Sequence, residues 1–433
     1  MTYLIRYSCV TGLGLLLTAC SHIAAEKPEI LSVHGAVSVV DRADWFSPLS
    51  IEIDGATVFA DSNGRYALDV DSQGTVQIKI SGPGVYTSVH TFAHTELTKD
   101  GNRLLAPKIN LVEKTANRRL LTFGGDVMMG RRYLAPKWDE PLLIEEKSRL
   151  IDMTNILSEM RPYFSPADFS AVNLETILTT TELPDSAPKS VVFYTHPDIL
   201  KALEATGVDY VSLGNNHTYD YLEAGIETTL QAFSGSSIGQ SGAGKNSQSA
   251  LAPYTADLGG IPVANWGFVG WAGRVTPNQV AGVNKGGAAH GTDDNIAKAL
   301  QSGARPEQID VMQYHGSREY SSGPTEVSER RLKAAIDNGA DLVIGHHPHV
   351  SQGLEVYNGK LIAYSLGNFA FDQYFYATHG AIAVNVWMDG EDFYRAEILP
   401  LHIKGYRPVP AVGSVRDYVL ARVASLSAQH GTS

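Results

Sequence analysis

Hydrophobic and polar positions follow two different patterns along the chain, and the first pattern occupies roughly its first quarter. There, short runs rich in β-branched and aromatic residues are separated by turn dipeptides such as Asp54-Gly55 and Asn63-Gly64. Runs of this length between such turns predict strands joined by hairpins. We therefore expect residues 30–112 to form a small all-β sandwich domain.

The second pattern alternates strand-like runs with stretches in which apolar residues recur at helical spacing. Four such helical stretches are clear, at residues 148–160, 196–207, 221–233 and 324–339. Strands that alternate with helices predict a layered α/β core. We expect this α/β domain to span residues 118–405.

Three later segments carry separate expectations. The Gly/Ser-rich residues 234–250 are expected to form a loop. The runs at residues 360–371, 380–388 and 393–403 lack long helical spacers, so we expect them to form a meander that completes a second sheet. Residues 406–433 form a tail that includes a short amphipathic helix.

Composition and charge narrow the class of protein. The 433 residues are 43% apolar and 18% charged, which is typical of a globular protein with a real core. The formal net charge of −12, without a dense basic run, argues against nucleic acid and anionic lipid headgroups as nonspecific partners. A polyanionic substrate would need local help, for example from metal ions.

The N-terminus predicts export. Arg6 precedes a short apolar stretch, and Leu17-Thr18-Ala19-Cys20 follows it. This resembles a bacterial lipoprotein signal, which implies a signal peptide at 1–19, lipidation of Cys20 and a linker at 20–29. The protein is then expected to be lipid-anchored in the cell envelope, with the outer membrane preferred in a Gram-negative source because Ser21 follows the cysteine.

Five strand-like runs in the α/β region each end on a polar cluster. They are residues 120–131, 169–176, 210–220, 310–320 and 342–350. In an open α/β sheet the carboxyl ends of parallel strands meet, so clusters placed there converge whatever their distance in sequence. The pattern predicts one site built from all five runs.

The residue types in these clusters suit metal ligation. The candidate ligands are a carboxylate at each of two strand ends, one amide and three imidazoles: Asp126, Glu175, Asn216, His315, His347 and His349. This mixed donor set permits Mn, Fe or Zn. A pair of such ions would lower the pKa of bound water, so that hydroxide is available near neutral pH. Local alternatives remain open, since Asp126 also suits a surface turn and Asn216 a helix N-cap.

Three further residues suit catalysis beside the metals. His217 adjoins Asn216 and would donate a proton to the leaving group, with Asp220 holding its imidazole in one tautomer. Arg131 suits bidentate binding of a phosphate or carboxylate, and a structural salt bridge is the alternative.

The region from Leu120 to Asp372 resembles the CapA family, which is linked to poly-γ-glutamate capsule synthesis. Six ordered motifs carry the resemblance: residues 125–131, 172–175, 215–220, 315–320, 345–350 and 364–372. The resemblance implies a four-layer α/β/β/α metallophosphatase-like sandwich, two divalent metals at the shared edge of its sheets, and substrate contacts from Asn368 and Glu319. The family's aromatic after the histidine at position 315 is missing here, since Gly316 and Ser317 follow it.

Residues 61–66 and 81–86 resemble the transthyretin-like regulatory domain of carboxypeptidases, although turn chemistry alone also explains them. The β domain is then either a binding module or a packing spacer.

Two classes of function follow. One is a metal-dependent hydrolase that cleaves a phosphoester or a γ-amide of an envelope polymer. The other is a noncatalytic, metal-bearing subunit that anchors or exports an anionic polymer such as poly-γ-glutamate, within a synthase or export complex.

Overall fold

The structure is a computed structural model that describes residues 31–42, 45, 47–70, 74–137, 139–303 and 305–432. The predicted signal peptide, Cys20 and the linker lie outside the described residues. Among the described residues, no helix has both the length and the apolar composition that crossing a membrane requires.

An N-terminal β domain precedes the α/β part of the chain. Its strands form two sheets whose facing sides bury Val33, Ile51, Ile78 and Leu104 in one core. The first sheet contains β1 (Leu31–Val39), β4 (Arg65–Val70), β7 (Thr98–Asp100), β8 (Arg103–Leu105) and β9 (Ile109–Leu111). The second contains β2 (Ser50–Ile53), β3 (Ala56–Phe59), β5 (Thr75–Ser81) and β6 (Ser88–Ala93).

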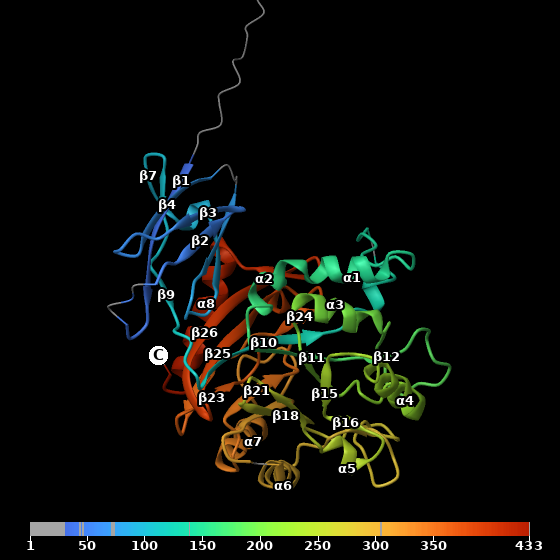
Figure 1. Cartoon of the computed structure of the whole chain (residues 1–433). Helices are drawn as coiled ribbons and strands as arrows, with labels where there is room; N and C mark the ends of the chain where they lie inside the picture. Colours follow the sequence, from blue (N-terminus) through green and yellow to red (C-terminus); the bar gives the residue numbers. More distant parts are fainter. Residues whose placement is uncertain are drawn as a thin grey trace, which may run out of the picture.

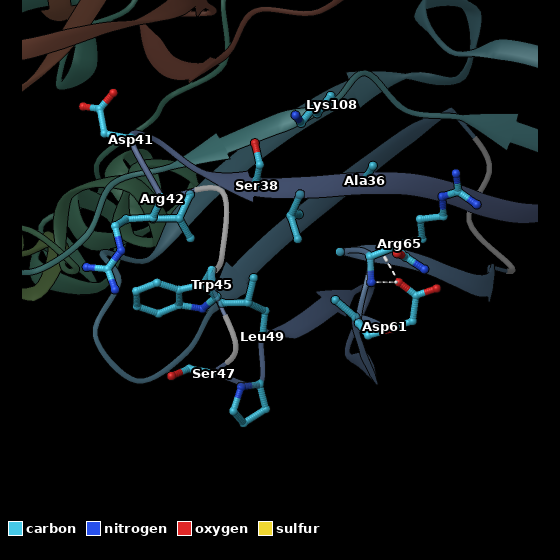
Figure 2. Close-up of a pocket in the computed structure, with 17 residues that line it drawn as sticks. Ala36, Ser38, Asp41, Arg42, Trp45, Ser47, Leu49, Asp61, Arg65 and Lys108 are labelled. Carbon is cyan, nitrogen blue, oxygen red and sulfur yellow. Dashed lines mark hydrogen bonds between the residues drawn. The ribbon is translucent and has the colours of Figure 1, made fainter.

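The β domain has an open hollow at one end of its sandwich. Figure 2 shows Arg42 and Trp45 on one side of this hollow, which measures about 1150 Å³, and Asp61 with Arg65 on the other. Asp61 Oδ1 accepts hydrogen bonds from the backbone N–H of Asn63 and of Arg65, both at 2.8 Å. Local turn chemistry therefore accounts for this Asp-Ser-Asn-Gly sequence.

Two facing sheets form the α/β part. The first has the order β15-β14-β11-β10-β25-β26-β27, with β24 also paired to β10, and the second has the order β17-β18-β20-β21-β23-β22. The first contains β10 (Arg118–Val127), β11 (Phe169–Leu174), β14 (Tyr210–Ser212), β15 (Gly239–Ser241), β24 (Asn368–Ala370), β25 (Gly380–Asp389), β26 (Asp392–Lys404) and β27 (Arg407–Pro410). The second contains β17 (Tyr254–Asp257), β18 (Pro262–Val269), β20 (Ile309–His315), β21 (Leu342–His346), β22 (Leu354–Tyr357) and β23 (Lys360–Ala363).

Helices lie on the outer faces of both sheets (Figure 1), except the C-terminal helix, whose Val419 and Val423 belong to the apolar cluster between the sheets. The helices are α1 (Arg149–Leu157), α2 (Arg161–Phe164), α3 (Asp198–Thr206), α4 (Leu222–Phe233), α5 (Ser247–Ala250), α6 (Asp293–Gly303), α7 (Glu326–Asp337) and α8 (Gly413–Ala428). Two-stranded pairings of β12 (Ile177–Leu178) with β13 (Tyr194–Thr195) and of β16 (Ala243–Gly244) with β19 (Gly287–Ala288) complete the fold.

Three apolar clusters show that the architecture has four layers. One cluster fills the space between the sheets, with Phe123 from the first and Ile344 from the second. Another packs α1 and α3 on the first sheet, and a third packs α6 and α7 on the second, around Trp266. The expected mixed α/β class with an α/β/β/α sandwich is therefore confirmed.

The structure corrects two expectations about the later strands. The antiparallel meander of β25, β26 and β27 forms, but it extends the first sheet beside β10 instead of completing the second. The run at 360–371 divides between β23 of the second sheet and β24, which pairs with β10. Residues 234–250 are not only a loop, because β15, β16 and α5 lie within them. In β15, Gly239–Ser241 pairs with β14 at the edge of the first sheet, a placement that only the tertiary fold supplies. The predicted tail helix is present as α8, but its apolar residues are not confined to one face; Val419, Val423 and Ser427 are its buried residues.

Helix α8 also contacts the β domain. Arg416 donates to the backbone oxygen of Thr91 at 2.9 Å, and its guanidinium lies 4.9 Å from the centre of the Phe92 ring. A second contact comes from the Tyr86 hydroxyl, which donates to the Arg118 oxygen at 2.7 Å. These contacts join the β domain to the α/β part.

Candidate metal centre

The candidate site lies where parallel strands of both sheets end. Strands β10, β11, β14 and β15 are parallel in the first sheet, as are β18, β20, β21 and β23 in the second. Asp126 stands at the end of β10, Glu175 directly after β11, and His315 at the end of β20. His347 and His349 follow β21, so all these groups reach one edge.

The backbone at this edge is unusually tight. A Cβ added to Gly125 would lie 1.9 Å from the oxygen of Gly367, so only glycine lets β10 approach the segment before β24. His347 and His349 both adopt left-handed backbone conformations, with φ of 96° and 58°. Bulky residues in this region carry strain that the surrounding fold must hold, and such residues concentrate at functional sites.

Five of the six predicted ligands converge. Ligand atoms lie within 4.8 Å of one another in three overlapping groups: Glu175, His315 and His347; Asp126, Glu175 and His349; and Glu319, His347 and His349. Glu319, predicted to contact substrate, thus also lies at ligand distance from two histidines. We refer to Asp126, Glu175, His315, Glu319, His347 and His349 as the acid–histidine cluster.

Buried polar atoms without partners test whether these residues fit a metal. Both carboxylate oxygens of Glu175, Nε2 of His315 and Nδ1 of His347 are buried and make no hydrogen bond. Oδ1 of Asn216, the sixth predicted ligand, is also buried and makes no hydrogen bond. Buried acceptors are rarely left unpaired in proteins, and here they are donor atoms of the kind that divalent ions bind. The cluster is therefore compatible with metal binding.

The electrostatics of the two carboxylates differ. Burial alone would raise the pKa of Asp126, but hydrogen bonds and charge from His346 and His349 outweigh burial and hold that pKa well below its usual range. Burial raises the pKa of Glu175 well above its usual range, and the charge of Asp126 raises it further. The charge of His349 lowers the pKa of Glu175 but does not outweigh burial, so a cation would further favour the ionised carboxylate.

The pKa values of the three histidines also shift in opposite directions. Burial lowers the pKa of His347 to about 3 and that of His315 well below its usual range. Burial would also lower the pKa of His349, but the carboxylates of Glu175 and Asp126 outweigh it and raise that pKa to about 9. Without metal, a proton on His349 therefore provides the positive charge among the carboxylates, and metal binding would displace it.

Several residues that the sequence did not identify hold the cluster in place. Asn173 Nδ2 donates to Asp126 Oδ1 at 2.8 Å and lies 3.2 Å from His315 Nδ1. His346 lies 3.4 Å from Asp126 Oδ1 and hydrogen-bonds Gln313 at 3.0 Å. Such contacts fix the orientation of ligand side chains.

Asn368 belongs with these supporting residues. It is fully buried, its Oδ1 lies 2.9 Å from His349 Nδ1, and its Nδ2 donates to Gln373 at 3.0 Å. Both ends of its amide are therefore used within the protein. The structure places Asn368 behind His349, where it orients the imidazole and does not line the cavity that substrate would enter.

His217 and Asp220 lie together as predicted. His217 Nδ1 is 2.5 Å from Asp220 Oδ2, and His217 Nε2 is 3.7 Å from Glu175 Oε1, at the edge of the cluster. The Phe193 ring stacks on the imidazole with 3.9 Å between ring centres. Burial lowers the pKa of His217 to about 4 although Asp220 opposes the shift, so the resting imidazole is neutral.

Lys189 completes this group and carried no signal in the sequence. Its Nζ donates to Asp220 Oδ1 at 2.5 Å and to the backbone oxygen of Asn216 at 2.9 Å. The lysine therefore contacts both the residue behind His217 and the backbone of a predicted ligand. It lies in the irregular segment between β12 and β13, where no periodic pattern predicts a neighbour.

Arg131 forms the salt bridge that was its alternative interpretation. In the short 3-10 turn at Arg131–Tyr133, its Nε donates to Asp372 Oδ2 at 3.0 Å and its Nη2 to Asp372 Oδ1. The backbone N–H of Arg132 donates to Asp372 Oδ2 at 3.1 Å, and its Nη1 to the Asp372 backbone oxygen. Arg131 nevertheless lines a cavity of about 250 Å³ together with His217, Glu319 and His349. The larger hollow of Figure 2 contains none of the predicted site residues.

Trp271, which was not among the predicted site residues, packs beside two of the histidines. Trp271 lies with its ring centre 4.6 Å from that of His347 and 6.2 Å from that of His315. It follows the end of β18 by two residues, and the predicted ligands likewise lie within a few residues of a strand end. That shared position was the signal available in the sequence.

Similarity to known proteins agrees with this geometry. The model of the bacterial capsule synthesis protein family PGA_cap matches residues 120–373. This chain belongs to the PGA_cap family. The matched residues include the whole acid–histidine cluster, Asn216, His217 and Asp220, whereas the β domain lies outside the match. The resemblance to the CapA family is thus confirmed.

Individual relatives match over most of their own length. The PGA biosynthesis protein CapA of Bacillus subtilis (strain 168) is 29% identical over 290 residues, which are 67% of this chain and 73% of that protein. The capsule biosynthesis protein CapA of Bacillus anthracis is 27% identical over 311 residues, 70% of this chain and 72% of that protein. A hypothetical protein of known structure from Thermus thermophilus has a TM-score of 0.39 at 14% identity, covering 65% of this chain and 99% of that one.

Proposed function

We propose that this PGA_cap protein is a metal-dependent hydrolase that acts on a phosphoester or γ-amide of an anionic envelope polymer such as poly-γ-glutamate. The observation that carries the proposal is the convergence of six acidic and imidazole side chains at the edge shared by both sheets. Membership of a capsule synthesis family supports the choice of polymer.

The overlap of the three ligand groups supports a pair of metals. Glu175 belongs to two groups, as do His347 and His349, so neighbouring ions would share side chains. Asp126, Glu175, Asn216, His315, His347 and His349 would hold them, with Glu319 as a further donor. Two divalent cations would supply Lewis acidity and lower the pKa of water. The mixed donor set suits Mn, Fe or Zn.

His217 would transfer the proton that the leaving group needs. Its Nδ1–H donates to Asp220, which fixes the tautomer and leaves Nε2 facing the cluster. The neutral imidazole can take up a proton once an anionic substrate enters, because nearby negative charge stabilises the imidazolium. Asp220, held by Lys189, would stabilise that charge. Arg131, which already neutralises Asp372, would contact an anionic group of the substrate from the cavity wall.

A noncatalytic role is the second candidate. One relative is described as a PGA biosynthesis protein and a Mycobacterium tuberculosis relative as a probable polyglutamine synthesis accessory protein, and neither description names a hydrolase. On this second candidate the chain would be a subunit that anchors or exports polymer. In that case the metals would serve as cationic docking points. Lipidation of Cys20 would tether either kind of protein to the envelope membrane, and a synthase or export complex would be its partner.

One experiment separates these candidates. The purified full chain is analysed for Mn, Fe and Zn, and then assayed on phosphomonoesters, phosphodiesters and γ-glutamyl peptides. We expect close to two metals per chain and turnover of at least one substrate class. Metal without turnover, together with retained polymer binding, would support the noncatalytic subunit. Absence of metal, with no rise in melting temperature on adding Mn²⁺, Fe²⁺ or Zn²⁺, would refute both.

A further inference from the structure

Nearly all exposed aromatic side chains of the described residues gather beside the acid–histidine cluster. Six such side chains are solvent-exposed, and five of them are Tyr320, Tyr374, Phe375, Tyr376 and Tyr418. The sixth, Phe59, lies on β3 of the β domain. Single exposed apolar residues need no explanation, but a contiguous group marks a surface that binds something.

Three ring contacts and one step along the chain, from Phe375 to Tyr376, connect these side chains into what we call the aromatic track. Tyr418 on α8 lies 6.3 Å from Tyr376, measured between ring centres, and Tyr376 follows Phe375 in the chain. Phe375 lies 4.6 Å from Tyr374 and 5.4 Å from Tyr320. The track then reaches the cluster, because Tyr320 lies 6.2 Å from His349.

The inner end of the track is held by the same contacts that hold the cluster. The Tyr320 backbone N–H donates to the oxygen of Pro348 at 2.8 Å, and Gln373 Nε2 donates to the Tyr320 hydroxyl at 3.2 Å. Gln373 also accepts from Asn368, which contacts His349. Tyr320, Tyr374 and Phe375 line the 250 Å³ cavity that contains His217 and His349. The track therefore leads into the cavity.

Two guanidinium groups lie beside the exposed rings at the cavity. Arg131 and Arg132 both contact the buried carboxylate of Asp372, and Glu319 also lines the cavity, so these four side chains together carry no net charge. The Arg132 guanidinium also lies 4.9 Å from the centre of the Tyr374 ring. Cationic groups beside exposed rings can bind the carboxylates and the methylene groups of one ligand together.

We propose that the aromatic track binds an extended polycarboxylate chain and directs one repeat of it into the cavity beside His349. This inference deepens the proposed function, on which it rests, by assigning the surface that would receive the polymer. The track extends from α8 well beyond the cavity, so a chain of several repeats contacts it and a single monomer does not. Methylene groups pack on the rings, while a carboxylate reaches the arginines.

Fluorescently labelled poly-γ-glutamate tests the track directly. The purified full chain, supplied with Mn²⁺, is titrated alongside Phe375→Ser, Tyr376→Ser and the double variant, with Phe59→Ser as the matched control. Loss of two stacking rings is expected to raise the dissociation constant by about thirtyfold in the double variant, since each aromatic contact contributes roughly 1 kcal/mol. Phe59→Ser should bind like the wild type. Free glutamate and a γ-linked dipeptide should bind far more weakly than the polymer.

Two results would overturn the proposal. One is polymer affinity that the double variant leaves unchanged, while its melting temperature and metal content match the wild type. The other is preferential binding of a neutral glucan such as dextran, which would identify a carbohydrate surface. The titration is also repeated without metal, so that failure of the track can be distinguished from failure of the metal centre. Metal analysis of the wild type tests the metal centre separately.

Discussion

Lys189 Nζ lies 2.5 Å from Asp220 Oδ1, and the other oxygen of that carboxylate lies 2.5 Å from His217 Nδ1. The lysine thus neutralises a fully buried carboxylate whose second oxygen orients the histidine. Because Lys189 also donates to the Asn216 backbone oxygen, it holds two parts of the site in one geometry.

Replacing this lysine should be costly. Lys189→Met leaves the Asp220 carboxylate buried without its cation, and we expect a loss of about 2 kcal/mol in the free energy of unfolding. Turnover should fall as well, because the His217 imidazole loses its fixed partner. Lys189→Arg is the control, since it keeps the charge and should restore most of the stability measured by urea unfolding. Equal stability of Lys189→Met and wild type would contradict the assigned contact.

His217 should affect chemistry and not metal content. His217→Ala removes the proposed proton donor, so turnover should drop by about a hundredfold or more. Its side chain belongs to none of the three ligand groups, and metal analysis should therefore give the same stoichiometry as wild type. A matching loss of metal would show instead that His217 is a ligand.

Glu175 should lower the stability of the metal-free protein while supporting metal binding. Neither of its buried oxygens has a hydrogen-bond partner, and its pKa is raised by burial and by the charge of Asp126. Glu175→Gln removes a buried carboxylate whose burial the charge of His349 does not outweigh, so the metal-free melting temperature should rise, on the order of 2 °C. The further rise that Mn²⁺ produces in the wild type should shrink or vanish in this variant. Differential scanning fluorimetry with and without Mn²⁺ measures both effects, and a lower metal-free melting temperature would count against this account of Glu175.

Asp310 should make stability fall with rising pH. Burial raises its pKa to about 6 in the folded protein, despite a hydrogen bond from Gln308 at 2.6 Å. A raised carboxyl pKa means that the folded state binds the proton more tightly than the unfolded state. The stabilisation is therefore complete below the unfolded pKa and is lost as pH rises through about 6.

The matched variant for that prediction is Asp310→Asn, which keeps an oxygen for Gln308 to donate to. We expect its melting temperature to exceed that of the wild type at pH 8 and to approach it at pH 4. A wild-type advantage at pH 8 would mean that the ionised carboxylate is favourable in the fold.

The predicted ligands came from strand ends because that rule depends only on local pattern. Asp126, Glu175, His315 and the two histidines at 347 and 349 each follow an apolar run, and parallel strands bring such positions together. Trp271 obeys the same rule and was missed because a lone tryptophan is more often a core residue.

Other parts of the site depend on contacts that no local pattern encodes. Lys189 lies in an irregular segment, and its partner Asp220 is 31 residues away. Asp372, 241 residues away in sequence, forms a salt bridge with Arg131. The structural salt bridge was one of the two interpretations of that arginine, the other being substrate binding. The placement of β25 beside β10, which corrected the expected second sheet, likewise comes from pairing across the whole domain.

Helix α8 links two regions that are far apart in sequence. Arg416 binds the backbone of Thr91 in the β domain, and Tyr418, two residues further along the helix, forms the outer end of the aromatic track. A displacement of the β domain that kept the Arg416–Thr91 contact would also displace Tyr418. Through α8, the β domain is thus connected to the outer end of the aromatic track, although none of its described residues lines the cavity.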